Sequence, residues 1–78
     1  MFLETDKPIR KNQVQHFRNA NYTLPDYFYK AGIFYVQLGN LVANSSYGAT
    51  RISIRCSGPT CEDQIKAFES LLETAINS

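Results

Sequence analysis

The stretch ATRISIRCSGPTCEDQIKAFESLLETAIN, residues 49–77, holds the two elements that decide the fold. Its first part alternates between an apolar and a polar set: Thr50, Ile52, Ile54 and Cys56 against Arg51, Ser53 and Arg55. Such a period of two predicts a strand with one buried face and one wet, basic face. The segment SGPT then ends the strand, because Gly and Pro interrupt regular structure.

A helix is predicted after this break, over about 61–76. Thr60 and Asp63 have the spacing of a capping box, and early acids favour the positive end of the helix dipole. At about 100° per residue the apolar residues form one stripe, consisting of Cys61, Ile65, Phe68, Leu72, Ala75 and Ile76. We therefore expect a core centred on Ile52, Ile54, Cys56, Ile65, Phe68 and Leu72.

A second strand is predicted at IFYVQL, residues 33–38, which is rich in β-branched and aromatic residues. Gly39 is interpreted as a bulge after which LVA continues the strand, and NSSYG is interpreted as a loop. Together these runs predict a hairpin over about 33–57. The expected fold class is α+β, with a small antiparallel sheet of two to four strands packed against the C-terminal helix.

The N-terminal third is less regular. Residues 1–12 are polar and contain Pro8, so we expect a loosely held arm on a single small domain covering 1–78. The segment QVQHFR, 13–18, is consistent with a short edge strand. The segment PDYFYKAG, 25–32, fits either a two-turn helix ended by Gly32 or a turn followed by a strand, and we favour the turn and strand.

The composition and net charge of the chain exclude some classes of function. The 78 residues carry a net charge of +1, which excludes long-range capture of nucleic acid or membrane by the whole molecule. Seven basic against three acidic residues give 1–60 a charge of +4, and one basic against four acidic residues give 61–78 a charge of −3. This asymmetry favours docking or head-to-tail self-association. No apolar run has the length of a signal or a membrane span, so we expect a cytoplasmic chain with no membrane partner.

No catalytic or metal-binding constellation accompanies the single histidine, His16, so we expect neither an enzyme nor a cofactor. Cys56 and Cys61 supply only half of a zinc site. Both fall on the apolar faces of their elements, which favours buried free thiols over the alternative, a disulfide across the strand–helix corner.

The remaining signal is aromatic, because six of the ten aromatic residues lie between 22 and 35. Tyrosine is enriched at protein interfaces. We therefore predict a non-enzymatic adaptor, small subunit or inhibitor that binds another protein or a second copy of itself. The candidate contacts are Tyr27, Phe28, Tyr29, Lys30, Tyr35, Arg51 and Arg55.

Nucleic-acid binding is the alternative function, through a basic sheet face and the N-terminal arm. It would use Arg10, Lys11, Arg18, Lys30, Arg51 and Arg55. A double-stranded RNA-binding domain is rejected because the last helix begins Cys-Glu-Asp, and carboxylates at that position would repel phosphate.

Overall fold

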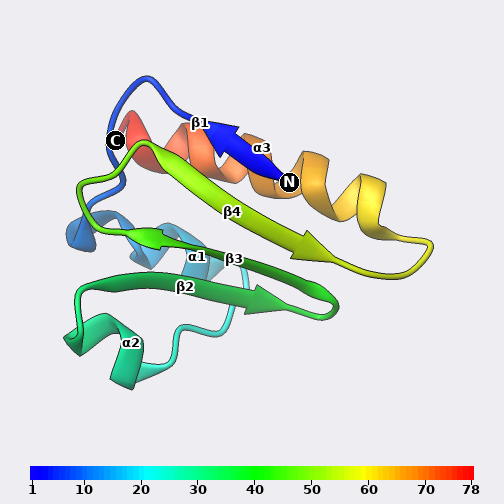
Figure 1. Cartoon of the computed structure of the whole chain (residues 1–78), viewed down its shortest axis with the longest axis horizontal. Helices are drawn as coiled ribbons and strands as arrows, with labels where there is room; N and C mark the ends of the chain where they lie inside the picture. Colours follow the sequence, from blue (N-terminus) through cyan, green and yellow to red (C-terminus); the bar gives the residue numbers. More distant parts are fainter.

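The computed structural model describes all 78 residues and contains one four-stranded antiparallel sheet (Figure 1). The spatial order of the strands is β1-β4-β3-β2. Their bounds are β1 Phe2–Glu4, β2 Ile33–Leu38, β3 Leu41–Ser46 and β4 Arg51–Cys56. The predicted α+β class, with its small antiparallel sheet, is confirmed.

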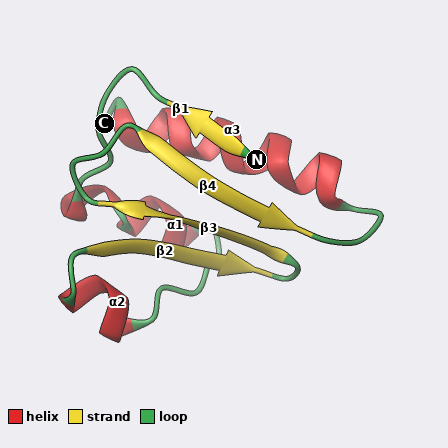
Figure 2. Ribbon diagram, viewed as in Figure 1, coloured by secondary structure: helices red, strands yellow, loops and turns green.

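Helices cover one face of this sheet (Figure 2). The long helix α3, Cys61–Ile76, matches the predicted C-terminal helix. It packs beside α1, Gln15–Asn19, with the rings of Phe17 and Phe68 5.7 Å apart. The 3-10 turn η1, Lys11–Gln13, precedes α1, and α2, Asp26–Lys30, lies next to the β2 edge. None of these helices has the length and apolar character needed to cross a membrane.

The core lies between the sheet and the α1–α3 layer. Ile52, Ile54, Phe68 and Leu72 are buried as predicted, and Cys56 and Ile65 are half-buried at its margin. Ten more buried apolar residues complete it: Ile9, Val14, Phe17, Tyr22, Phe34, Val36, Leu41, Ala43, Ala75 and Ile76. Edge-to-face contacts between aromatic rings join this set, for example Phe17 with Phe34 at 5.2 Å.

The N-terminal segment is not a loose arm, which corrects the expectation for residues 1–12. Phe2–Glu4 form the edge strand β1, in which Leu3 is paired with Ile52 of β4. Ile9 is completely buried. Pairing between residues about fifty positions apart leaves no local pattern in a polar stretch, so the sequence did not reveal it.

Two further expectations fail in the first half of the chain. Residues 13–18 are helical in η1 and α1, because Val14 and Phe17 must face the same core. The favoured turn and strand at 25–32 is instead a short helix. Pro25 precedes it with a φ of −60°, and Gly32 follows it with a φ of +79° that other residues rarely adopt.

Gly39 is in a turn and not a bulge, so the expected long strand is two strands. Leu38 pairs with Leu41 across the two-residue loop Gly39–Asn40. The positive φ of Gly39, 57°, suits the first central residue of a tight hairpin turn. Residues 33–56 therefore form three strands, β2, β3 and β4, where two were expected.

The predicted capping box does not form, since Thr60 makes no side-chain bond to the helix backbone. Its hydroxyl instead donates to Gln64 Oε1 at 3.1 Å. The Gln64 amide donates in turn to the carbonyl of Leu38 at 3.1 Å. This link holds the start of α3 against the end of β2.

Candidate functional site

One face of the sheet carries no helix layer, and we call it the open face. Residues that pair across antiparallel strands share a face, so the strand register defines its members. They are Phe2 and Glu4 of β1, Arg51, Ser53 and Arg55 of β4, Val42, Asn44 and Ser46 of β3, and Ile33, Tyr35 and Gln37 of β2. The predicted wet, basic side of β4 is part of this face.

The β1 end of the open face is built around an arginine on an aromatic ring. The guanidinium carbon of Arg51 lies 4.1 Å from the ring centroid of Phe2, a cation–π distance. Phe2 is 59% exposed. Glu4 Oε1 lies 3.9 Å from Arg51 Nε, and both side chains remain mostly exposed. Phe2 was not among the predicted contacts, because an isolated aromatic residue in a polar segment carries no periodic signal.

The β2 end of the open face is aromatic. The ring of Phe28, from α2, stacks on Tyr35 with centroids 4.5 Å apart and planes 17° apart. Tyr27 packs edge-on against Phe28 at 5.5 Å and is 77% exposed. Ile33 lies on β2 with Tyr35 and is exposed, and it was not among the contacts predicted from sequence. Tyr27, Phe28 and Tyr35 are therefore brought together as a continuous aromatic surface.

Small polar residues separate these two ends. Asn44 and Ser53 lie opposite each other in the middle of the sheet. Together with Phe2, Ile33 and Arg51 they line a shallow hollow. Arg55 is exposed on β4 beyond Ser53 and forms no ion pair. The face thus presents exposed aromatic and aliphatic groups with arginine nearby.

Tyr29 does not belong to this face, which corrects its grouping with Tyr27 and Phe28. Its ring packs edge-on against Tyr47 at 6.1 Å. Lys11 Nζ lies 5.1 Å from the centroid of the Tyr29 ring, and the Arg18 guanidinium carbon lies 5.5 Å from it. Successive residues of a five-residue helix point in different directions, so α2 contributes to two surfaces.

Tyr47 has an unusual environment beside this cluster. Its hydroxyl is buried and has no hydrogen-bond partner. Burial raises the pKa of Tyr47 above its ordinary value of 10.0, and Tyr29 raises it further, while Arg18 opposes both effects. Tyr47 therefore stays neutral through the physiological range.

The basic residues proposed for nucleic-acid binding do not form one surface. Lys11 and Arg18 lie beside Tyr29, whereas Arg51 and Arg55 belong to the open face. Lys30 is held at 3.0 Å from Asp26 by an ion pair within α2. Arg10 is exposed just before η1. This separation weakens the alternative function.

The cysteines form a disulfide, so the favoured interpretation as free thiols is wrong. Cys56 ends β4 and Cys61 begins α3, with their Cα atoms 5.7 Å apart. The apolar faces of both elements meet at this corner, as predicted, and that meeting brings the two sulfurs together. Disulfides persist mainly in oxidising compartments.

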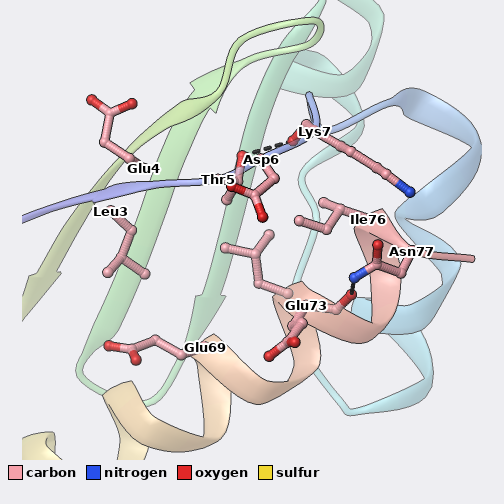
Figure 3. Close-up of a pocket in the computed structure, with 10 residues that line it drawn as sticks. Leu3, Glu4, Thr5, Asp6, Lys7, Glu69, Glu73, Ile76 and Asn77 are labelled. Atoms are coloured by element: carbon pink, nitrogen blue, oxygen red, sulfur yellow. Dashed lines mark hydrogen bonds between the residues drawn. The ribbon is translucent and has the colours of Figure 1, made fainter.

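A separate cavity of about 290 Å³ lies between β1 and the C-terminal half of α3 (Figure 3). Leu3, Leu72 and Ile76 form its apolar part. Asp6 and the α3 residues Glu69 and Glu73 bring carboxylates to its margin. These acids do not gather closely enough to hold a metal ion.

Comparison with protein-family models, curated proteins and solved structures finds no match to this chain. The surfaces of the molecule are therefore the basis on which a function can be proposed. Of these, the open face combines large exposed apolar groups with Arg55, a cation that forms no ion pair.

Proposed function

We propose that this protein is a non-enzymatic binding protein that recognises another protein through the open face of its sheet. The observation that carries the proposal is the uncovered sheet itself, with the Phe28–Tyr35 stack at one end and the Phe2–Arg51 pair at the other. Exposed apolar groups that form a surface are typical of interaction sites. Tyr and Arg are also the residue types that dominate binding energy at protein interfaces.

The charges of the open face suggest the chemistry of the partner. The open face carries two positive charges, on Arg51 and Arg55, and one negative charge, on Glu4. We expect a partner surface that offers an apolar centre and at least one carboxylate for Arg55. A second copy of the chain is one such partner, because Asp63, in the first turn of α3, offers an exposed carboxylate that forms no ion pair.

Protein recognition is favoured over nucleic-acid binding because the basic residues are dispersed. A nucleic-acid groove needs several cations along one track. The open face offers two arginines, one of which is within 3.9 Å of a carboxylate. The expected cytoplasmic location remains a prediction, and the Cys56–Cys61 disulfide weighs against it.

The experiment is quantitative affinity capture from the native host with three immobilised proteins. These are the parent, a face variant carrying Tyr35→Ser and Arg55→Ala, and a control carrying Lys66→Ala and Ser70→Ala on exposed parts of α3. We expect one protein to be retained by the parent and the control and lost from the face variant, with and without nuclease treatment.

Two results would overturn the proposal. Equal retention by all three proteins would show that the open face is not the binding surface. Retention that disappears with nuclease would assign the face to nucleic acid instead. A separate experiment, analytical sedimentation of the parent and of the face variant, measures their oligomeric states and tests whether the partner is a second copy.

A further inference from the structure

The outer edge of the sheet at β1 has backbone groups without partners. Met1, Leu3 and Thr5 direct their hydrogen bonds inward to β4, as the bonds from Ile54 N to Met1 O and from Thr5 N to Thr50 O show. In an antiparallel ladder the alternate residues point the other way. The N–H and C=O groups of Phe2 and Glu4 therefore face outward along a free edge.

The cavity of Figure 3 lies directly beside this edge, on the helix side of the sheet. Leu3 connects the free edge to the cavity, because its side chain points from β1 toward α3. An additional strand paired to β1 would place a residue opposite Leu3 on the same face. That side chain would enter the cavity between Leu3, Leu72 and Ile76.

The charged groups that line the cavity are mostly acidic, since Glu4, Asp6, Glu69 and Glu73 are accompanied by one basic residue, Lys7. Asp6, Glu69 and Glu73 form no ion pair. Glu69 and Glu73 are four residues apart on α3, a spacing at which like charges repel. Glu73 also lies near the negative end of the α3 dipole, and no basic residue occupies the last turn. Acidic residues at these two positions are therefore unfavourable for the stability of α3 itself.

We propose that β1 accepts an extended peptide segment of a partner protein, with a lysine or arginine side chain seated in the cavity beside α3. Strand addition supplies main-chain hydrogen bonds, and the pocket selects the alternate side chain. The aliphatic stem of the basic residue packs on Leu72 and Ile76, and its charged head lies beside Glu69 and Glu73 of α3, with Asp6 adding a longer-range attraction. This site goes beyond the open-face function and uses a different edge of the molecule.

The test uses a capped, fluorescently labelled heptapeptide of alternating threonine and valine with lysine at its centre. Two matched peptides carry norleucine or glutamate at the central position. We expect the full chain to bind the lysine peptide about tenfold more tightly than the norleucine peptide, the scale of one partly buried charged contact. Amide exchange at Phe2 and Glu4 should slow when the lysine peptide is bound.

Charge variants locate the selectivity. The variant Glu69→Gln with Glu73→Gln should lose the preference for lysine over norleucine, and Asp6→Asn should reduce it. The control Glu62→Gln with Asp63→Asn, in the first turn of the same helix, should keep the full preference. All these side chains are exposed, so the fold should tolerate each change.

Equal affinity for the lysine and norleucine peptides, or unchanged exchange at Phe2 and Glu4, would overturn the proposal. So would a lysine preference that survives in the Glu69/Glu73 variant. The open-face variant carrying Tyr35→Ser and Arg55→Ala should bind the lysine peptide as the parent does. The two proposals can therefore fail independently.

Discussion

The rings of Phe28 and Tyr35 stack with centroids 4.5 Å apart, although one residue is in a helix and the other is in a strand. This contact joins α2 to the open face of the sheet. It explains why a segment with strand-like composition is helical. As a helix, residues 26–30 send Phe28 to Tyr35 and Tyr29 to Tyr47, so both aromatic groups are packed.

Replacing Phe28 by alanine should weaken this connection and lower the free energy of unfolding by about 1–2 kcal/mol, from the lost stacking and partial burial. Urea denaturation measures the change. The neighbouring Tyr27→Ala is the matched control and should cost less than about 0.5 kcal/mol, because Tyr27 is mostly exposed. Equal losses for the two variants would show that the stack does not hold α2.

Phe68→Ala should lower the free energy of unfolding by about 3–5 kcal/mol, because Phe68 is fully buried and contacts the rings of Phe17 and Tyr22. A loss of this size would unfold much of a domain this small at room temperature, which far-ultraviolet circular dichroism and urea denaturation can detect. Phe2→Ala should leave the free energy of unfolding within about 0.5 kcal/mol of the parent. A Phe68→Ala variant as stable as the parent would contradict the assigned core.

The regions of the fold that could be predicted from sequence are those whose pattern is local. Strict alternation at 50–56 and the helical stripe at 61–76 each arise from a single element with one buried face. The N-terminal strand and the helices at 11–19 could not be predicted in this way. Ile9, Val14 and Phe17 are buried in a core to which the distant strands and α3 supply most of the residues, and too few apolar residues occur in this segment to show a period.

The Cys56–Cys61 disulfide should stabilise the domain by about 2 kcal/mol, the chain-entropy effect of closing a short loop. Urea denaturation with and without reductant measures this difference, and the Cys56→Ser with Cys61→Ser variant should match the reduced parent. Alkylation followed by mass spectrometry checks the bond directly. Two alkylated cysteines in unreduced, folded protein would contradict it.

Tyr47→Phe should raise the free energy of unfolding at neutral pH by about 1 kcal/mol, because it removes a buried hydroxyl that has no partner. It should also reduce the loss of stability in alkali. Burial raises the folded-state pKa of Tyr47 above 10.0, so the stabilising neutral form is complete below that value and is lost as the pH rises through the folded-state pKa.

Urea unfolding of the parent and of Tyr47→Phe, between about pH 7 and about pH 11, measures this dependence. The parent should become less stable above about pH 10, and the variant should lose less. The pKa of Tyr22 is also raised by burial, so part of the alkaline loss should remain in the variant. Parallel pH profiles for the two proteins would contradict the assigned environment of Tyr47.

The candidate site was predictable only in part. Arg51 and Arg55 follow from strand alternation, and Tyr27, Phe28 and Tyr35 follow from aromatic density. Which tyrosines share a surface depends on a five-residue helix and on strand register, so the sequence could not separate Tyr29 from its neighbours. The contribution of Phe2 depends on β1 pairing with β4, which no local pattern indicates.

The measurement that tests the open face most directly is site-specific photo-crosslinking in the native host. A benzoylphenylalanine side chain is introduced in place of Val42, which lies between Gln37 and Arg55 on the open face, and in a second protein in place of Ser70, on the outer side of α3. Binding through the open face predicts one crosslinked protein adduct from position 42 and none from position 70. The same adducts from both positions, or no protein adduct from position 42, would contradict it.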